Sequence, residues 1–156
     1  MRSRPYQPAD FEPLYAIEEA CFLPPMRFTR AYMCRILMSC TGAAWGAEDA
    51  RGLAGFAVSS LQRSVASAVA YIETIEVCEE RRGQGIGAEL LARIEESARA
   101  AGLDAVALHV DQENAAAIRL YEAAGYTQTG REANFYPDRR PALVYVKPLS
   151  SRSGDS

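Results

Sequence analysis

The stretch VCEERRGQGIGAELLARIEESARAAG, from Val77 to Gly102, decides the fold of this chain. Its glycines lead directly into a helix that Gly102 can stop in a left-handed conformation. Strand-like runs flank the stretch at Ala68–Val77 and Asp104–Val110. This order predicts a βαβ unit with two parallel strands. The helix has an apolar stripe at helical spacing, made of Leu90, Leu91, Ile94, Ala98 and Ala101.

Further elements follow on both sides of this unit. Runs at Arg2–Gln7, Gly42–Glu48 and Leu53–Gln62 predict strands, the last two in an antiparallel meander with Ala68–Val77. One helix follows Pro8 and ends before Pro24, and Thr29 caps a second. Asn114 caps a helix that stops at Gly125, and Tyr126–Phe135 with Ala142–Val146 predicts a closing hairpin. The whole pattern predicts an α+β (mixed α/β) fold with about seven mostly antiparallel strands and about four helices.

Length and composition favour one globular domain. The chain has 156 residues, of which 49% are hydrophobic and 24% are charged, so it carries enough apolar surface for one core. We expect a single domain over residues 1–149 and a disordered polar tail over residues 150–156. The net charge of −3 argues against nucleic acid as the main partner.

Cysteines and histidine do not form a metal-binding pattern. Cys21, Cys34, Cys40 and Cys78 lack C-x-x-C spacing, and His109 is the single histidine. No metal site is expected. The sequence also has no signal-peptide pattern and no apolar run of about 20 residues that would span a membrane. A cytoplasmic protein with free thiols is the expectation.

The glycine loop Arg82–Gly87 is suited to binding an anion. It precedes a helix, where unpaired main-chain N–H groups and the helix dipole attract phosphate. Glycine allows close approach of the backbone, and Arg81 and Arg82 add positive charge nearby. The same letters also satisfy a dinucleotide fingerprint at Gly83, Gly85 and Ala88. Here, however, Cys78–Arg82 separates the glycines from the strand before them, and three further strands come earlier. A flexible turn without a ligand is a further interpretation.

The loop resembles the coenzyme A signature of the GNAT N-acetyltransferase superfamily, Arg/Gln-x-x-Gly-x-Gly/Ala after a strand that ends in valine. Arg82, Gly85 and Gly87 fill its three defined places. This resemblance implies acetyl-coenzyme A as cofactor and a parallel strand–helix–strand unit that splays at the cofactor site. Glu79 and Glu80 stand near the place where the family often has proline. The residues implied to bind the cofactor here are Ile75, Glu76, Val77, Arg82, Gly83, Gln84, Gly85, Ile86, Gly87 and Ala88.

A second block, NAAAIRLYEAAGY at residues 114–126, is similar to the N-x-x-A-x-x-L-Y-x-x-x-G-F/Y block of the same superfamily. The resemblance implies that Asn114 contacts the pantetheine arm and that the Val77 amide meets the thioester oxygen. Tyr121 occupies the place of the general acid or sulfur hydrogen-bond donor. Packing in the core is the alternative for Tyr121, because aromatic residues at helical spacing are often buried.

Amine acetylation needs a route for the ammonium proton. His109 suits this role, since a free imidazole titrates near pH ~6.5. A hydrogen-bonded core histidine is equally compatible with the pattern. LHV at residues 108–110 resembles the N-terminal acetyltransferase for methionine-starting peptides, in which this histidine pairs with a strand tyrosine. Tyr71 stands at the matching place, with Glu73 as a reserve base, and an ordinary aromatic on a sheet is the alternative for Tyr71.

Two loops resemble the substrate loops of N-terminal acetyltransferases. The first, FLPPMRF, contains Phe22, Pro24, Pro25 and Phe28, which are implied to line the pocket for the first side chain of the peptide. The second, NFYP, contains Phe135 and Tyr136 and resembles the Asn-Tyr-Tyr-Pro motif of the ribosomal-protein enzymes. Glu73 is a further candidate for substrate binding. Phe135 lacks the hydroxyl of the tyrosine that it replaces.

These resemblances together predict acetyl transfer to the α-amino group of a protein or peptide N-terminus by direct attack, with a ribosomal protein as one candidate substrate. Two alternatives stay open. One is acetylation of a small amine, such as a polyamine, amino acid or drug; the other is a non-catalytic sensor that binds acyl-coenzyme A. No nucleic-acid or membrane partner is expected, and the oligomeric state is not predicted.

Overall fold

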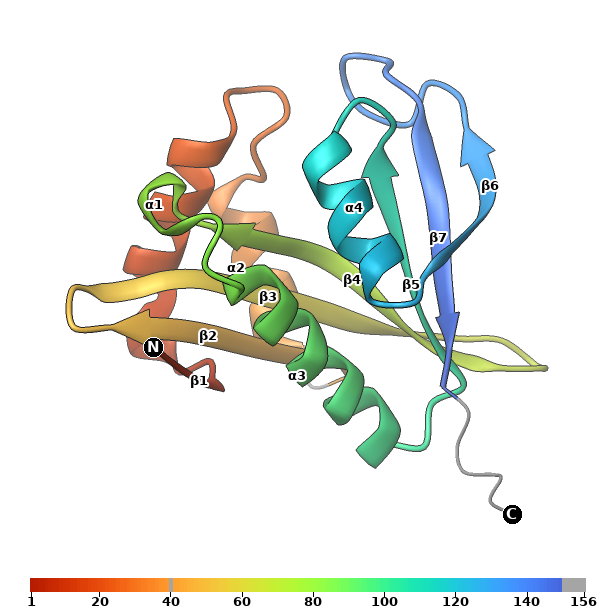
Figure 1. Cartoon of the computed structure of the whole chain (residues 1–156), viewed down its shortest axis with the longest axis horizontal. Coiled ribbons are helices and arrows are strands. Elements are labelled where there is room, and N and C mark those ends of the chain that lie inside the picture. The colour runs from red at the N-terminus through yellow and green to blue at the C-terminus, as the bar shows by residue number, and fades with distance from the viewer. Residues whose placement is uncertain (40, 150–156) are drawn as a thin grey trace. The chain divides into compact units, whose positions relative to one another are not determined.

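A computed structural model describes residues 1–39 and 41–149. The backbone divides into two compact units (Figure 1). The first unit contains residues 1–60 and 73–94, and the second contains residues 61–72 and those from 95 onward. The single domain therefore stays a prediction, and the tail predicted over residues 150–156 lies outside the described residues, as does Cys40.

The described part of the chain contains seven strands and four α-helices, as predicted. The helices are α1 (Phe11–Cys21), α2 (Arg30–Met38), α3 (Ile86–Ala100) and α4 (Ala115–Ala123). Short 3-10 turns, η1 (Pro8–Asp10) and η2 (Glu79–Arg81), precede α1 and α3. The strands are β1 (Arg2–Pro5), β2 (Ala43–Asp49), β3 (Gly52–Arg63), β4 (Ala68–Val77), β5 (Ala105–Asp111), β6 (Thr127–Glu132) and β7 (Ala142–Pro148).

The strands form a mixed sheet in the order β1-β2-β3-β4-β5-β7-β6. The β4–β5 pair is parallel, with Tyr71 opposite Ala107, and this confirms the predicted βαβ unit. The β1–β2, β2–β3, β5–β7 and β6–β7 pairs are antiparallel. No helix among the described residues has an apolar stretch long enough to cross a lipid bilayer.

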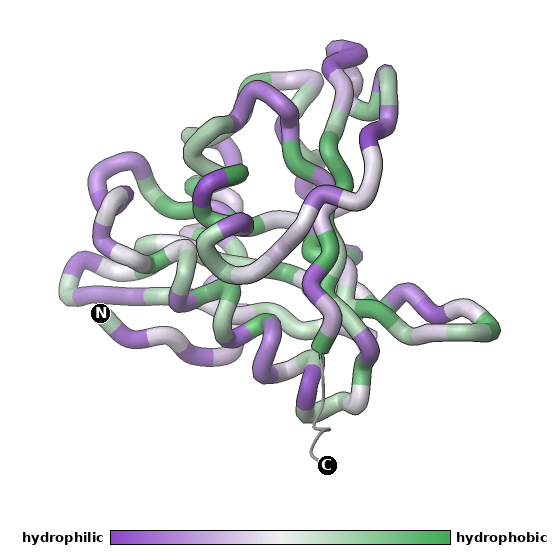
Figure 2. The backbone as a smooth tube through the Cα atoms, turned by 45° about the vertical axis from the view of Figure 1, so that its right-hand side comes forward, coloured by the Kyte–Doolittle hydropathy of each residue, from purple (hydrophilic) through white to green (hydrophobic). Residues whose placement is uncertain are grey.

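In the first unit, helices α1 and α2 bury apolar side chains against β3. The Thr29 hydroxyl accepts a hydrogen bond from the Tyr32 N–H, which confirms the predicted cap of α2. Along the backbone, hydrophobic and hydrophilic residues alternate as burial of one helix or strand face requires (Figure 2). The buried cluster consists of Leu14, Tyr15, Ile17, Met33, Leu37, Phe56 and Val58.

In the second unit, β5 shows strict alternation. Val106, Leu108 and Val110 are buried, whereas Ala105, Ala107 and His109 lie on the half-buried face. The amine of Lys147 and the Tyr126 hydroxyl both donate to the buried carboxylate of Glu95, at 3.0 and 2.9 Å. This pairing compensates a charge that would otherwise be costly to bury.

The closing hairpin is shorter than predicted. Strand β6 ends at Glu132, so Phe135 and Tyr136 lie in a loop rather than on a strand. Asn134 adopts the left-handed conformation, with φ of 57°, and an extended strand cannot continue through such a residue. The prediction that the strand reaches Phe135 is therefore wrong.

Gly55 allows β3 to approach the end of β4 closely. A Cβ at position 55 would lie 2.7 Å from the Glu76 carbonyl oxygen and 3.3 Å from the Val77 Cα. Gly55→Ala should therefore lower the free energy of unfolding by about 1–3 kcal/mol, because the backbone must move. Urea unfolding measures this change. Gly130→Ala is the control, since its Cβ meets nothing closer than 3.8 Å; an equal loss in both variants would contradict the close-approach explanation.

Candidate functional site

The loop before α3 holds main-chain N–H groups at an open surface. Gly83 and Gly85 have φ values of 80° and 81°, and a Cβ at either position would meet nothing within 4 Å. Helix α3 begins at Ile86, and the Glu89 N–H donates to the Gly85 carbonyl at 3.0 Å. Helix geometry leaves the preceding N–H groups, up to Ala88, without partners inside the helix. These donors suit a phosphate group.

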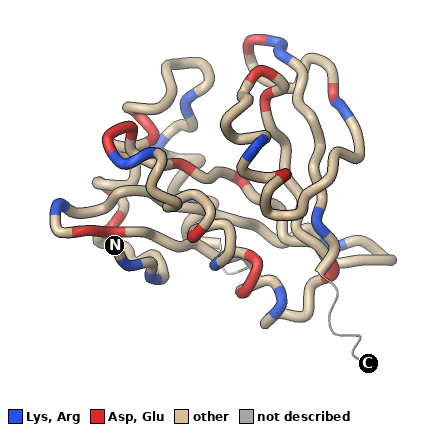
Figure 3. Tube along the Cα trace, in the orientation of Figure 1, with Lys and Arg blue, Asp and Glu red and all other residues tan. Residues whose placement is uncertain are grey.

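The two arginines of the loop are engaged in contacts within the first unit. Arg81 is buried and bonds to the Asp49 carboxylate at 2.8 Å. Arg82 donates to the Val77 carbonyl at 3.1 Å and to the Cys21 sulfur at 3.5 Å. In Figure 3 this segment is a short red run followed by a blue one, because Glu79 and Glu80 precede the two arginines. Main-chain N–H groups are therefore the donors of this loop that lack a described side-chain or helix role.

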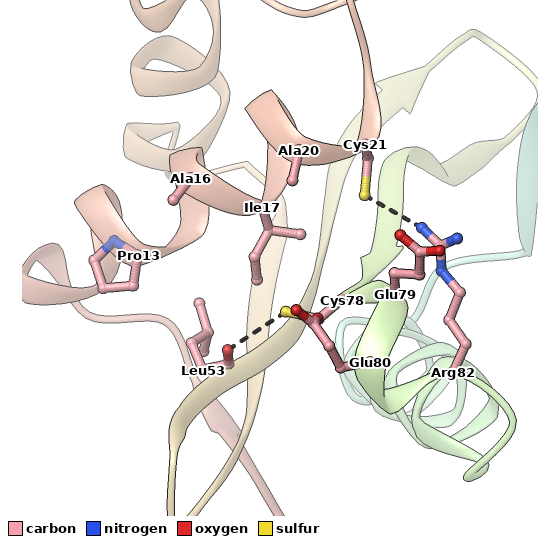
Figure 4. Close-up of a pocket in the computed structure, with 10 residues that line it drawn as sticks. All are labelled: Pro13, Ala16, Ile17, Ala20, Cys21, Leu53, Cys78, Glu79, Glu80 and Arg82. Atoms are coloured by element: carbon pink, nitrogen blue, oxygen red, sulfur yellow. Dashed lines mark hydrogen bonds between the residues drawn. The ribbon is translucent and has the colours of Figure 1, made fainter.

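A cavity of about 400 Å³ lies beside Arg82, between α1 and η2. Figure 4 shows Cys21 and Arg82 facing each other at one end of it, and the Cys78 sulfur near the Leu53 carbonyl, at 3.8 Å. Cys21, Cys34 and Cys78 are free thiols, and burial raises the pKa of the Cys21 thiol. The cavity is lined by Pro13, Ala16, Ile17, Ala20, Cys21, Leu53, Cys78, Glu79, Glu80 and Arg82.

At the end of β4, successive side chains point to opposite faces of the sheet. Ile75 and Val77 are half-buried, whereas the Glu76 side chain is buried with 5% of its surface exposed. Glu76 accepts a hydrogen bond from the Thr74 hydroxyl at 2.6 Å. Of the predicted cofactor-binding residues, Glu76 therefore offers only its backbone, while its carboxyl group belongs to the interior.

Tyr71 and His109 meet in the second unit. The Tyr71 hydroxyl lies 2.8 Å from Nδ1 of His109, and Nε2 of His109 lies 3.0 Å from Glu132. A carboxylate can only accept, so Nε2 carries the proton and donates it to Glu132. Nδ1 is then the acceptor for the Tyr71 hydroxyl. The side chain of His109 is 17% exposed and that of Glu132 55% exposed.

The NFYP loop closes over this chain of hydrogen bonds. The Phe135 ring stacks on His109, with centroids 4.1 Å apart and planes 11° apart, and Tyr136 packs edge-on against Phe135 at 4.9 Å. Burial raises the pKa of Tyr136 to about 12. Because aromatic rings cover the imidazole on this side, they limit its exposure to water.

Helix α4 carries Asn114 and Tyr121. The Asn114 side-chain oxygen accepts from the Ala117 N–H at 3.1 Å, which confirms the predicted cap and leaves its amide nitrogen as a donor. Tyr121 is buried, with its ring edge-on to Tyr126. Burial raises the pKa of Tyr121 well above its usual value, so the phenol stays protonated near neutral pH.

Glu73 is part of a polar group in the first unit. Its two carboxylate oxygens accept from the Tyr32 hydroxyl at 2.7 Å and the Ser60 hydroxyl at 2.8 Å. Burial and the Glu73 charge raise the pKa of Tyr32 to about 12. The structure therefore places the Glu73 carboxyl group in contact with α2 and β3, where the two hydroxyl groups donate to it.

Two hydrogen bonds to the Phe28 backbone fix the position of the α1–α2 loop. The Phe28 N–H donates to Glu18 and its carbonyl accepts from the Tyr15 hydroxyl, at 2.8 and 2.7 Å. The Phe28 and Tyr32 rings pack with centroids 4.9 Å apart. Phe22, at 37% exposure, stays at the surface. The peptide bond between Pro24 and Pro25 is cis.

Sequence reasoning missed Glu132, Tyr32, Ser60 and Glu18. Glu132 is the last residue of β6, whose register opposite β7 shifts between Gln128 and Gly130, and alternation alone does not reveal this shift. Tyr32 lies in the first turn of α2, four residues after Phe28. This spacing brings side chains together on a helix and could have indicated that the two rings pack.

Comparisons with known proteins agree with this arrangement. A model of the "Acetyltransferase (GNAT) family" matches residues 11–126. A mycothiol acetyltransferase of Stackebrandtia nassauensis is 35% identical over 82 residues, which cover 53% of this chain and 27% of that protein. The ribosomal protein bS18-alanine N-acetyltransferase of Escherichia coli is 30% identical over 101 residues, covering 63% of this chain and 66% of that protein.

The fold matches that of a solved N-acetyltransferase structure. NAA60 of Arabidopsis thaliana, in complex with a bisubstrate analogue, gives a TM-score of 0.85 at 22% identity over 97% of this chain and 99% of that one. The predicted family, fold and cofactor are confirmed, since GNAT acetyltransferases use acetyl-coenzyme A. This chain belongs to the Acetyltransferase (GNAT) family.

Proposed function

We propose that this chain transfers an acetyl group from acetyl-coenzyme A to the α-amino group of a protein or peptide N-terminus. The observation that carries the proposal is the chain of hydrogen bonds from Tyr71 through His109 to Glu132. The likeness to the E. coli enzyme named for alanine of a ribosomal protein supports it. A ribosomal protein, and hence a reaction in the cytoplasm, is part of the proposal.

The residues before α3 fit the cofactor. The open, left-handed backbone at Gly83 and Gly85 exposes the N–H groups up to Ala88, which would hold the pyrophosphate together with Arg82, Gln84, Ile86 and Gly87. Ile75, Val77 and Asn114 would hold the pantetheine arm. When bound, the coenzyme supplies the acetyl thioester that the amine attacks.

Tyr71 and His109 give the substrate proton a route. An ammonium group must lose a proton before its nitrogen can attack. The Tyr71 hydroxyl donates to Nδ1 of His109, so a proton taken up by the tyrosine oxygen can pass to the imidazole. Glu132 stabilises the imidazolium that forms, as a carboxylate does behind a histidine base.

Tyr121 is the proposed acid for the departing thiolate, because burial keeps its phenol protonated. Glu73, considered above as a reserve base, is better suited to binding substrate. Both of its oxygens already accept hydroxyl hydrogen bonds, so the carboxyl group is engaged with Tyr32 and Ser60. Phe22, Pro24, Pro25, Phe28, Phe135 and Tyr136 are the other proposed substrate contacts.

Acetylation of a small amine is a second candidate function. The observation in its favour is the match to mycothiol acetyltransferase, an enzyme named for a small molecule and not for a protein. The half-buried carboxylate of Glu73 is compatible with a cationic small substrate as well.

The cofactor loop can be tested by substituting two glycines that both have a positive φ. Gly85→Ala and Gly52→Ala both force a side chain into the left-handed region, with φ of 81° and 112°, and both have open space around the new Cβ. Each should lose about 1–2 kcal/mol of stability. Isothermal titration calorimetry should show weaker coenzyme A binding for Gly85→Ala alone. Equal affinities in both variants would count against the loop as the phosphate site.

The proton route can be tested by substitutions in the second unit. His109→Ala and Tyr71→Phe should each lower kcat about 10²–10⁴-fold, and Tyr121→Phe should also lower kcat, with little change in the Kd of acetyl-coenzyme A. Tyr145→Phe is the control, since it removes a hydroxyl that bonds to Glu122 instead. A thiol-release assay gives kcat; unchanged kcat in His109→Ala and Tyr71→Phe removes both residues from the proposal.

The substrate class can be tested with matched acceptors. Peptides with a free N-terminal amine should be acetylated, and the same peptides with a blocked N-terminus but a free lysine should not. Polyamines and amino acids form the third set. Mass spectrometry locates the added acetyl group. Turnover of small amines alone would replace the peptide proposal by the second candidate function.

A further inference from the structure

Two buried glutamates in the first unit have no role in the proposed reaction. Glu18 on α1 and Glu76 on β4 are 1% and 5% exposed. Burying one ionised carboxylate is costly, and burying two next to each other costs more, because like charges repel in a medium of low polarity. The pair therefore needs compensation from its surroundings.

Each of the two carboxyl groups receives a hydrogen bond from the described residues at only one of its two oxygens. Oε2 of Glu18 accepts from the Phe28 N–H at 2.8 Å, and Oε2 of Glu76 accepts from the Thr74 hydroxyl at 2.6 Å. Oε1 of each residue is buried and receives no hydrogen bond from the protein groups described. The two carboxyl groups lie within hydrogen-bonding reach of each other.

A single proton placed between the two unpaired oxygens would give both of them a hydrogen-bond partner. If Glu76 carries the proton on Oε1 and donates it to Oε1 of Glu18, all four oxygens take part in a hydrogen bond. Oε2 of Glu18 keeps the acceptor role toward Phe28 that an ionised carboxylate fulfils best. The assignment also leaves one buried negative charge instead of two.

The charged and titratable neighbours agree with this assignment. Arg82 is the nearby cation, and its guanidinium is already bonded to Val77 and Cys21. The Cys21 thiol, which faces Glu76 from α1, has a raised pKa and so adds no charge near neutral pH. Burial, followed by Glu18, raises the pKa of Glu76 to about 10, and Arg82 only partly opposes this rise.

We propose that Glu76 and Glu18 share one proton, and that this hydrogen bond holds the α1–α2 loop on β4 by positioning Phe28. Glu76 and Glu18 are then positioning residues: they act on the substrate through the Phe28 backbone. This last step rests on the proposed function, because Phe28 is a proposed substrate contact. The shared proton itself does not depend on it.

The sign of the pH effect follows from the folded-state pKa of Glu76, about 10, against about 4.3 for an unfolded glutamate. The folded protein binds the extra proton between these values. The stability from this group is therefore complete below about pH 4 and is lost as the pH rises toward 10. Glu76→Gln cannot titrate, yet its amide can donate to Glu18 and accept from Thr74, so it should flatten this dependence.

Infrared difference spectroscopy of the full chain at pH 8 tests the proton directly. The wild type should show the C=O stretch of a protonated carboxyl group, and Glu76→Gln should lack it. The exposed Glu80 gives a matched control, because Glu80→Gln makes the same change of side chain at the surface and should retain the band. Absence of the band in the wild type at pH 8 would falsify the shared proton.

Two further measurements separate positioning from simple stability. Urea unfolding between pH 6 and 9.5 should give a falling stability for the wild type and Glu80→Gln and a shallower fall for Glu76→Gln; equal slopes would overturn the proposal. Glu76→Ala should raise the KM for a peptide about tenfold, and Glu76→Gln, which keeps both hydrogen bonds, should restore the KM. A peptide KM unchanged in Glu76→Ala would remove the positioning role. A chain inactive on every amine would refute the proposed function and leave the infrared and unfolding results valid.

Discussion

The constraint on which the rest depends is the set of main-chain N–H groups at the start of α3, which would hold the anion of the proposed cofactor site. Helix geometry provides these donors, and the left-handed backbone at Gly83 and Gly85 keeps side chains away from them. Arg81 is held by Asp49 and Arg82 by Val77 and Cys21, so the arginines brace the loop more than they attract the ligand. In the proposed mode of binding the loop holds the anion mainly with its backbone, while the contacts of its arginines also support the fold.

Strand β4 links this loop to the proposed chemistry through alternation. Tyr71 and Glu73 lie on one face of the strand, whereas Ile72 and Glu76 lie on the other. Tyr71 contacts His109 and Glu73 contacts Tyr32, so this face carries residues of the proposed site. On the opposite face Ile72 and Glu76 are buried, and the carboxyl group of Glu76 is close to that of Glu18. One strand therefore carries the residues of the proposed reaction on one face and the proposed positioning residue Glu76 on the other.

Local patterns allowed the fold to be predicted from the sequence, and a family resemblance predicted that Tyr71 and His109 meet, as they do in the structure. Apolar periodicity located α3, the side chains of Thr29 and Asn114 marked helix starts, and two motifs identified the family. Contacts that depend on register or on side-chain direction were not predictable. Glu132 reaches His109 through a shifted hairpin register, and the left-handed Asn134 ends the strand before Phe135. The role of the arginines and the meeting of Glu18 with Glu76 likewise required the tertiary structure, because their partners are distant in sequence.

The most direct test of the account is an NMR titration of the ¹⁵N-labelled protein, in which main-chain amides are observed one by one. Coenzyme A should shift the amide resonances of residues 85–88, whereas pantetheine, which lacks the pyrophosphate, should leave these four unshifted and still shift Val77. The amide of Gly52, which has a similar left-handed backbone away from α3, should respond to neither ligand. Coenzyme A binding without any shift at residues 85–88 would contradict the claim that the start of α3 holds the phosphates.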